Sequence, residues 1–438
     1  MTAFKDRLME TKKVSVWGIG YLGYTMLLKL QSKGFYADVF DFSQDRLNEL
    51  MEGDYPLSTQ KLAWSSKGEM PSLDLACIQA VASPDRMFRN HLHIVSFPGR
   101  SDTNISNRLE ELAKLFQSNH KNAHESMVLF QSAEIPGDLH RFFIDKLTAK
   151  GINCACATIF RTDWSIEEYL GVKNRQVISG NDSRAYEQTK WFMKILGIEC
   201  ASLTSIREAE IYECTRKTLQ HTISSLVNQV VLAYPDVDVL QMVGLMLKET
   251  CFDDIRPSIG SIGYKSATAT RNLLEGSIYP NRLTMVRDVD AANISTILNY
   301  AEIVRRRGLD SVTILGICEK GDLKDIRMSP ALILAEHLIG ESIKVSLHDP
   351  YFTPEEIKRL LPGAEYINIA NLTVQSACVF LMSDHRVYRY LSQNDLDRLG
   401  VSGADLVIDN CGIWQDYRFA SQTIYHIPGD GKLEALEQ

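Results

Sequence analysis

Residues 13–23, KVSVWGIGYLG, decide the fold of this chain. They run from a β-rich stretch into the pattern Gly18-x-Gly20-x-x-Gly23, and an apolar pattern with helical spacing follows. Gly18 permits a tight turn, Gly20 lets the backbone approach a pyrophosphate, and Gly23 lets the helix pack closely on the strand. The phosphates of a dinucleotide are then expected at the helix N-terminus, where amide groups and the helix dipole favour anions.

A second expected strand, residues 37–42, carries the acidic residue that completes this pattern. Asp41 follows the glycines at roughly the 20-residue spacing of dinucleotide sites, where it accepts hydrogen bonds from ribose hydroxyls. A carboxylate there repels a 2′-phosphate, so the sequence predicts NAD rather than NADP. The alternative is a glycine turn that binds nothing. The predicted cofactor-binding residues of this part of the chain are Gly18, Gly20, Tyr21, Leu22, Gly23, Asp41 and Arg46.

Strand-like and helix-like stretches alternate in two parts of the chain. Strands are expected at residues 73–80, 92–97 and 126–131, and the alternation restarts at residue 310. Such alternation predicts parallel sheets with helices on both faces. Residues 205–276 between these parts are typical of long helices. We therefore predict an α/β fold in which two Rossmann-like, doubly wound parallel-sheet domains (1–200 and 306–438) are joined by a central helical domain (201–305).

Composition limits the partners of the protein. A formal net charge of -8 over 438 residues argues against a surface for nucleic acid or anionic lipid. Neither a membrane-spanning apolar run nor a secretion signal is found, so no membrane partner is expected. The nine cysteines form no CxxC pair and the ten histidines show no ligand spacing. We therefore expect no metal site and a cytoplasmic location.

Residues 312–351, VTILGICEKGDLKDIRMSPALILAEHLIGESIKVSLHDPY, carry further motifs. A strand ending in glycine is followed by a loop with Lys320, a helix start at Asp325-x-Arg327-x-Ser329-Pro330 and a strand ending in Asp349-Pro350. This arrangement resembles the C-terminal domain of the UDP-glucose/GDP-mannose dehydrogenase family. The resemblance extends over nearly the whole chain through four further segments, namely the opening glycines, QSAEIPGD (131–138), Ala209-Glu210 and LVIDNCGIW (406–414).

The resemblance implies oxidation of a nucleotide sugar. Members of the family oxidise the C6 alcohol to a carboxylate, reduce two NAD and trap the aldehyde on a cysteine thiolate. Their glycine-rich cysteine loop corresponds here to residues 257–274, and matching its glycines at Gly260 and Gly263 puts Lys265 at the position of the thiol. Further family positions also differ, with Ala133 for threonine, Ile159 for glutamate, Glu213 for lysine, Lys217 for asparagine and Ala269 for aspartate, while Asp163 keeps an acidic group.

Each replacement has more than one interpretation. Lys265 with Tyr264 is either a relocated acid/base pair facing the nicotinamide, or a solvated loop lysine or phosphate partner. Glu213 and Lys217 have the spacing of an ordinary ion pair within one helix, worth about 0.2–0.5 kcal/mol. Cys214 and Cys251 are possible but unfavoured substitutes for the thiol. The candidate residues are, for catalysis, Lys265, Lys217, Glu213 and Asp163; for substrate binding, Lys320, Gly260, Gly263 and Tyr264; and for cofactor phosphate, Arg327.

Two functions remain open at this point. The first is an NAD-dependent oxidoreductase acting on the CH–OH of a nucleotide sugar or similar phosphorylated alcohol in polysaccharide biosynthesis. It would transfer two electrons, because the family thiol is absent. The second is a catalytically inactive member that binds NAD or nucleotide sugar as a dimeric partner, with a transient-redox epimerase as an intermediate case. The resemblance also implies a homodimer through the central helices, and the apolar stripe Leu219–Val231 suits either that interface or the core.

Overall fold

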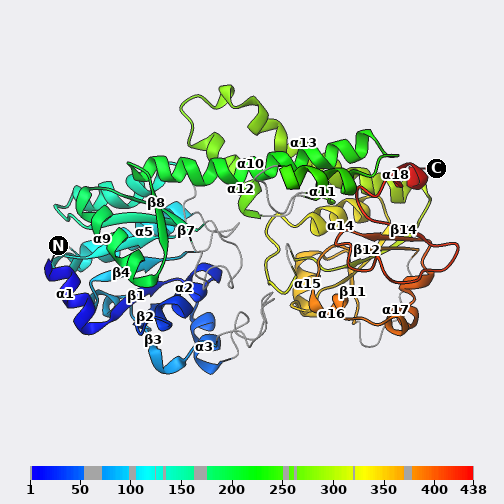
Figure 1. The fold of residues 1–438 in the computed structure, drawn as a ribbon. Helices are drawn as coiled ribbons and strands as arrows, with labels where there is room; N and C mark the ends of the chain where they lie inside the picture. Colours follow the sequence, from blue (N-terminus) through cyan, green and yellow to red (C-terminus); the bar gives the residue numbers. More distant parts are fainter. Residues whose placement is uncertain are drawn as a thin grey trace. The chain divides into compact units, whose positions relative to one another are not determined.

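The computed structural model describes residues 2–53, 72–97, 105–123, 125–131, 135–161, 175–249, 256–260, 264–318, 321–368 and 377–437. The chain divides into two compact units, residues 1–215 with 275–278 and residues 216–274 with 279–438. Each unit contains its own sheet of largely parallel strands (Figure 1), which confirms the predicted fold class of two Rossmann-like α/β domains. Within the described part of the chain, no helix has the length and apolarity to cross a membrane.

The first unit is built on an eight-stranded sheet with the order β3-β2-β1-β4-β5-β6-β7-β8. Neighbouring strands are parallel, except for the antiparallel pair of β6 and β7. The order reverses between β1 and β4, and doubly wound sheets bind their ligands at the carboxyl ends of the strands beside such a reversal. The strands are β1 (Lys13–Trp17), β2 (Tyr36–Phe40), β3 (Ile78–Ala80), β4 (Leu92–Val95), β5 (Met127–Phe130), β6 (Ala155–Arg161), β7 (Arg175–Gly180) and β8 (Glu199–Ser202).

An aromatic core supports the carboxyl edge of this sheet. Trp17, the last residue of β1, is fully buried and packs edge-to-face against Phe88. Its indole N–H donates to Nδ1 of His93 at 3.1 Å, and burial lowers the pKa of His93 to about 3. His93 is therefore a neutral core residue. The helices of this unit include α2 (Tyr21–Gln31), α3 (Gln44–Glu52), α5 (Ile105–Ser118) and α9 (Ser183–Leu196).

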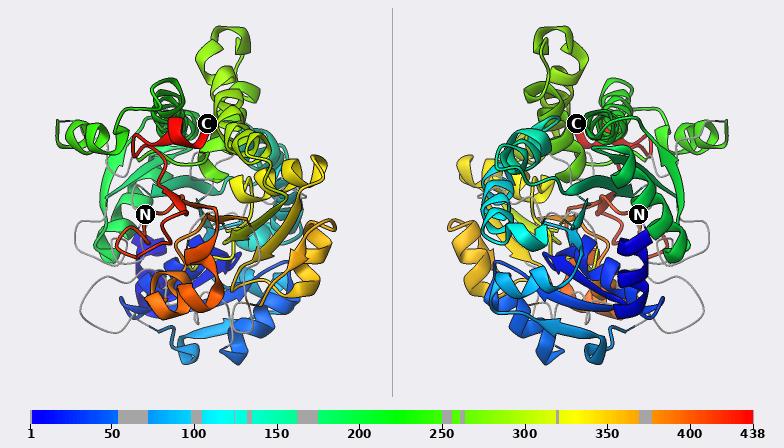
Figure 2. Two further views of the ribbon diagram at one scale, coloured as in Figure 1. Left: turned by 90° about the vertical axis from the view of Figure 1, so that its right-hand side faces the viewer. Right: turned by 90° about the vertical axis from the view of Figure 1, so that its left-hand side faces the viewer.

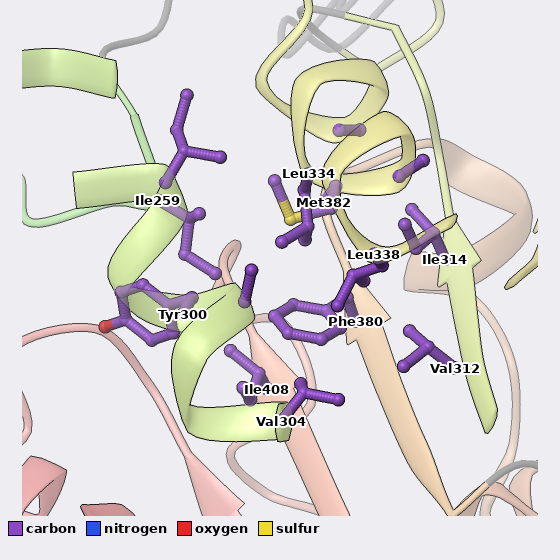
Figure 3. Close-up of a cluster of buried hydrophobic side chains, with 14 of the residues drawn as sticks. Ile259, Tyr300, Val304, Val312, Ile314, Leu334, Leu338, Phe380, Met382 and Ile408 are labelled. Atoms are coloured by element: carbon purple, nitrogen blue, oxygen red, sulfur yellow. The ribbon is translucent and has the colours of Figure 1, made fainter. Parts of the chain in front are cut away.

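The second unit contains a six-stranded, fully parallel sheet with the order β11-β10-β9-β12-β13-β14. Figure 2 shows its yellow-to-red strands beside yellow and orange helices. In the core, Tyr300 and Val304 lie with Phe380 and Leu338 (Figure 3). The strands are β9 (Ser311–Leu315), β10 (Lys344–His348), β11 (Glu365–Tyr366), β12 (Cys378–Leu381), β13 (Leu406–Asp409) and β14 (Ile424–His426). The helices include α12 (Tyr264–Glu275), α13 (Thr284–Arg306), α14 (Pro330–Gly340), α15 (Pro354–Leu360) and α17 (Gln393–Leu399).

One expectation about local structure needs correction. The strand expected at residues 73–80 is only β3, preceded by a 3-10 turn over Leu75–Cys77. Asp74 stabilises that turn, because its side chain accepts from the amide of Ala76. Helix α10 (Ile206–Ala233) begins in the first unit and continues in the second. The three-domain division therefore stays a prediction.

Candidate functional site

The glycine turn after β1 has a geometry that only glycine permits. Gly18 has a φ of 87°, and its amide donates to the carbonyl of Phe40 at 2.8 Å. A Cβ on Gly18 would lie 2.7 Å from the carbonyl oxygen of Ser96, and one on Gly23 would lie 2.0 Å from that of Gly18. The turn therefore packs against the end of β4 and against its own helix. These contacts agree with the roles predicted for the first and third glycines.

Helix α2 begins directly at this turn. Its N-cap is Gly20, which has no side chain to cap the helix, and Tyr21 and Leu22 form its first turn. A helix N-terminus of this kind presents backbone amides and the positive end of its dipole to an anion. The predicted phosphate position therefore lies at the carboxyl end of β1, beside the reversal in strand order.

Asp41 fixes the turn from the next strand. Its carboxylate is buried, with Oδ2 accepting from the amide of Ile19 at 3.0 Å and Oδ1 from the amide of Ser43 at 2.9 Å. Each carboxylate oxygen has two lone-pair directions, so Asp41 can hold the turn and still accept from a ribose hydroxyl. Arg46 is half-buried on the following helix, α3. The helix start, the glycine turn and the acid thus fit the adenosine and diphosphate parts of a dinucleotide.

Two residues at the same edge were missed by the sequence analysis. Ser96 follows β4 and Gln131 follows β5, and the Ser96 hydroxyl donates to Oε1 of Gln131 at 2.5 Å. Both side chains are buried. Their position directly after two neighbouring parallel strands was the available signal, because strand ends at a switch point carry ligand contacts.

Glu210 on α10 holds the segment that comes after β5. Its Oε2 accepts from the amide of Gly137 at 2.8 Å, and its side chain is almost fully buried. Burial raises the pKa of Glu210 to about 7, although hydrogen bonds from Gly137 and Leu139 oppose this change. The Ala209-Glu210 motif therefore has a structural role in the first unit.

The candidate catalytic residues are only partly described. Glu213 is buried and Lys217 is half-buried, both on α10, where each has further interactions. Cys214 is likewise buried on α10. The other positions on which the hypotheses drew, Asp163, Cys251, Ala133, Gly263 and Lys320, lie outside the described residues.

Lys265 does not lie in a loop. Tyr264 and Lys265 are the first two residues of α12, so the helix begins where a glycine-rich loop was expected. The physical reason is the composition of YKSATATRNLLE, which has no glycine or proline and includes the good helix formers Lys, Ala, Arg and Leu. Ala269 of this helix is buried. The loop expected over residues 264–274 is therefore wrong, and the role of Lys265 stays a prediction.

Residues 256–260, which precede α12, are held by side chains of the second unit. The amide of Ser258 donates to Oδ1 of Asn228 at 2.8 Å, and that of Ile259 donates to Oδ1 of Asn410 at 2.7 Å. The guanidinium of Arg256 donates to the carbonyl of Asn410 and, at 2.6 Å, to that of Cys411. The segment matched to the family's cysteine loop is thus fixed between α10 and the end of β13.

Gly260 ends this fixed segment in a conformation that favours glycine. It has a φ of 77°, and a Cβ there would lie 3.0 Å from side-chain atoms of Ile297 and Pro330. Its contribution to substrate binding stays a prediction. Asn228 and Asn410 were missed because their role depends on a loop distant in the sequence.

Cys411 is the thiol adjoining this segment. Burial raises the pKa of Cys411 well above its ordinary value, although Arg256 opposes that effect. The sulfur is therefore a neutral thiol at physiological pH and a weak nucleophile. It does not supply the thiolate that the family's chemistry uses.

Arg327 is engaged by a neighbour on its own loop. Its Nε donates to Oδ1 of Asp325 at 2.8 Å, and a second guanidinium nitrogen donates to Oδ2. This bidentate pair fixes the plane of the guanidinium. The predicted contact of Arg327 with cofactor phosphate is not tested by this geometry.

Cys318, Asp349 and His385 form a buried cluster whose ligand atoms lie within 4.8 Å of one another. Oδ2 of Asp349 accepts from the amide of Ile317 at 2.9 Å and from Nε2 of His385 at 3.0 Å. Nδ1 of His385 accepts from the amide of Asp322 at 2.9 Å. These residue types can ligate a divalent cation, which the sequence analysis did not foresee. The carboxylate and the imidazole are instead committed to hydrogen bonds that order the loop after β9.

The electrostatics of this cluster favour an ionised Asp349 beside a protonated thiol. Burial opposes ionisation of Asp349, but the hydrogen bond from His385 holds its pKa below the usual value. Burial and the charge of Asp349 raise the pKa of Cys318 well above its usual range. Cys318 is therefore a small packing residue rather than a nucleophile.

Known proteins share the motifs and the fold of this chain. Residues 313–416 match the model of the UDP-glucose/GDP-mannose dehydrogenase family, UDP binding domain. The UDP-N-acetyl-D-mannosamine dehydrogenase of Methanococcus vannielii is 21% identical over 431 residues, covering 95% of this chain and 97% of that protein. The corresponding enzyme of Methanocaldococcus jannaschii is 20% identical over 443 residues, covering 96% and 97%.

Solved structures agree in fold over nearly the full length. UDP-D-ManNAc dehydrogenase from Pyrococcus horikoshii has a TM-score of 0.75 at 17% identity, covering 96% of this chain and 100% of that chain. UDP-N-acetyl-mannosamine dehydrogenase from Staphylococcus aureus has a TM-score of 0.74 at 18% identity, covering 97% and 100%. Residues 313–416 thus match the UDP-binding domain of the UDP-glucose/GDP-mannose dehydrogenase family, and the chain shares the fold of these dehydrogenases over nearly its full length.

Proposed function

We propose that this chain is an NAD-dependent oxidoreductase that removes two electrons from the CH–OH of a UDP-linked sugar. The observation that carries the proposal is the site of the first unit, where a glycine turn and an uncapped helix start meet the buried carboxylate of Asp41. The matched UDP-binding domain in the second unit supports a nucleotide-sugar substrate. The names of the relatives make a UDP-N-acetylhexosamine the first substrate to examine.

Two-electron oxidation fits the side chains that remain. NAD held at the glycine turn would supply the hydride acceptor for the carbinol carbon, and a base of the chain would take the hydroxyl proton, so that a carbonyl product is left. Lys265 and Glu213 are the candidates for that base, and Asp41 orients the cofactor through its adenosine ribose. A second oxidation would require a thiolate to trap the aldehyde, and the family's cysteine position holds Lys265. The reaction should therefore end at the carbonyl.

A second candidate function is binding without turnover. It is favoured by the number of changed positions, because Glu213, Lys217, Lys265 and Ala269 all differ from the family's catalytic pattern. Such a protein would keep the NAD and nucleotide-sugar sites and act as the partner of an active member. A cytosolic location suits both candidates.

A homodimer is part of the proposal. The apolar stripe on α10 divides between two environments, with Val227 and Val231 in the core of the second unit. Leu219 and Leu226 are 47% and 59% exposed, so they offer a surface to a second copy of the chain. A change of Leu226 to Glu should convert a dimer to a monomer in light scattering, whereas Leu360→Glu, on an exposed position of α15, should not.

The activity is tested by following NADH absorbance with the full chain, NAD and a panel of UDP sugars that includes UDP-N-acetylmannosamine and UDP-glucose. We expect one NADH per sugar oxidised, and strongly reduced turnover in Lys265→Ala. Lys358→Ala, an exposed lysine of α15, is the matched control and should behave as wild type. Two NADH per sugar would contradict the two-electron reaction, and tight binding of both ligands without turnover would favour the second candidate.

A further inference from the structure

Only one of the two polar atoms in the Gln131 side chain, at the edge of the first sheet, has a hydrogen-bond partner among the described residues. Gln131 follows β5, is 5% exposed, and its backbone amide donates to the carbonyl of Val95 at 2.9 Å. Oε1 accepts the hydrogen bond from the Ser96 hydroxyl. The hydrogen bond from Ser96 therefore occupies the amide oxygen of Gln131 and leaves the amide nitrogen, Nε2, for another partner.

The amide nitrogen Nε2 of Gln131 is a hydrogen-bond donor. Among the described residues, Nε2 of Gln131 has no hydrogen-bond partner and is buried. A buried amide group without a partner is destabilising, so such groups are usually satisfied by the protein, by ordered water or by a bound molecule. The missing partner must be an acceptor, because the amide nitrogen only donates.

The strand order places Gln131 in line with the dinucleotide features. Asp41 follows β2, Gly18 follows β1, Ser96 follows β4 and Gln131 follows β5, and these four strands are consecutive neighbours in the sheet. Neighbouring strands are about 4.8 Å apart, so Gln131 lies about 10 Å along the edge from the glycine turn. A dinucleotide with its adenosine at Asp41 and its phosphates at the turn would extend its other half past Ser96 toward Gln131.

We propose that Nε2 of Gln131 donates a hydrogen bond to the nicotinamide riboside half of NAD, with Ser96 holding the amide in position. This inference rests on the proposed NAD binding and adds the residue that recognises the reactive half. The carboxamide oxygen and the ribose hydroxyls of that half are acceptors of the required kind. Gln131 is thus a cofactor-positioning residue that the glycine pattern does not include.

The test compares NAD with ADP, which keeps the adenosine and the diphosphate but lacks the nicotinamide riboside. Calorimetric titration of the full chain should give NAD binding that is about three- to ten-fold weaker in Gln131→Met, with ADP binding unchanged, because one neutral hydrogen bond is lost. Gln131→Glu keeps an acceptor for Ser96 but loses the donor, and it should show the same selective loss. Asp41→Asn should weaken NAD and ADP together.

Gln176 provides a matched control. It is a buried glutamine on β7, two strands beyond β5, and its amide also has no partner among the described residues. Gln176→Met should leave the ratio of NAD to ADP affinity unchanged. Equal effects of Gln131→Met on NAD and ADP, or no effect on either, would overturn the inference while NAD binding stands. A wild-type chain that binds neither ligand would instead contradict the proposed function itself.

Discussion

The first six strands of the first sheet have the same order as the six strands of the second, but the two sheets differ in the segment that connects the first strand to its helix. Gly18 and Gly316 both have a positive φ, 87° and 85°, and each donates its amide to the end of the adjacent strand at 2.8 Å. After Gly18 the helix begins at Tyr21, whereas after Gly316 the chain continues to Pro330 before α14 begins. The same framework therefore carries a short turn in one unit and a long loop in the other.

The difference determines what each helix start can bind. Ser329 caps α14, because its Oγ accepts from the amide of Leu332 at 3.2 Å and donates to the carbonyl of Ile317 at 2.7 Å. Helix α2 begins at Tyr21, after the N-cap Gly20, which has no capping side chain. A Rossmann-like strand order by itself therefore does not imply a dinucleotide site. The two units differ in whether a side chain caps the helix that follows the first strand.

The aspartates that follow the second strand of each sheet also differ, in how many hydrogen bonds they accept from the protein. Asp41 accepts from two backbone amides and leaves lone pairs for a ligand. Asp349 accepts from the amides of Ile317, Cys318 and Tyr351 and also from His385. The second unit thus uses its carboxylate to order its own loop, and NAD is expected only in the first.

The largest expected effect on NAD binding comes from Gly23→Ala. The added Cβ would lie 2.0 Å from the carbonyl oxygen of Gly18, so the turn must open and NAD binding should fall by more than 100-fold, about 2.7 kcal/mol or more. Gly340→Ala in α14 is the control, since its Cβ meets nothing within 4 Å. NAD titration of both variants is the measurement. Retention of tight binding in Gly23→Ala would remove the contrast between the units.

Replacing His385 should affect the second unit alone. His385→Ala leaves the buried Asp349 carboxylate without its imidazole partner, which should cost about 3–5 kcal/mol in the unfolding free energy of that unit. NAD affinity should stay within twofold of wild type. Denaturant unfolding and NAD titration measure the two quantities, and His337→Ala, at an exposed position of α14, is the control. Loss of NAD affinity would show that the second unit contributes to the NAD site.

A smaller effect is expected in the pH dependence of the unfolding free energy, through the buried acid Glu210. Burial raises the pKa of Glu210 to about 7, so the folded first unit binds a proton more tightly than the unfolded chain. Its contribution to stability is therefore present below pH 4.5 and lost as the pH rises through 7, by about 3 kcal/mol at most. Glu210→Gln should remove that pH dependence from the difference in unfolding free energy. An unchanged profile would mean that Glu210 is ionised at its ordinary pKa.

The smallest effect concerns cofactor choice. Asp41→Asn removes the charge that repels a 2′-phosphate but keeps one acceptor for the turn, so NAD affinity should fall by about fivefold, or roughly 1 kcal/mol. The preference for NAD over NADP should shrink by more than this. Asp45→Asn on α3 is the control, because Asp45 is an exposed acid on the next helix. An unchanged preference would assign the discrimination to another residue.

The sequence predicted the features that depend on local order. The glycine spacing, Asp41 and the helix after Gly20 lie within one short stretch, and both sheets follow from alternating strands and helices. It could not predict that Asn228 and Asn410 hold the segment before α12, because those contacts join residues far apart in the chain. It also expected a loop at Lys265, where α12 begins at Tyr264, since the helix propensity of YKSATATRNLLE was not weighed against the family glycines.

Hydrogen exchange with and without NAD tests the central contrast most directly. NAD should slow the exchange of amides in residues 18–24 and 41–43, where the turn and Asp41 lie, and should leave residues 316–330 unchanged. Protection of residues 316–330 in place of the first turn, or no protection in either unit, would contradict the assignment of NAD to the first sheet.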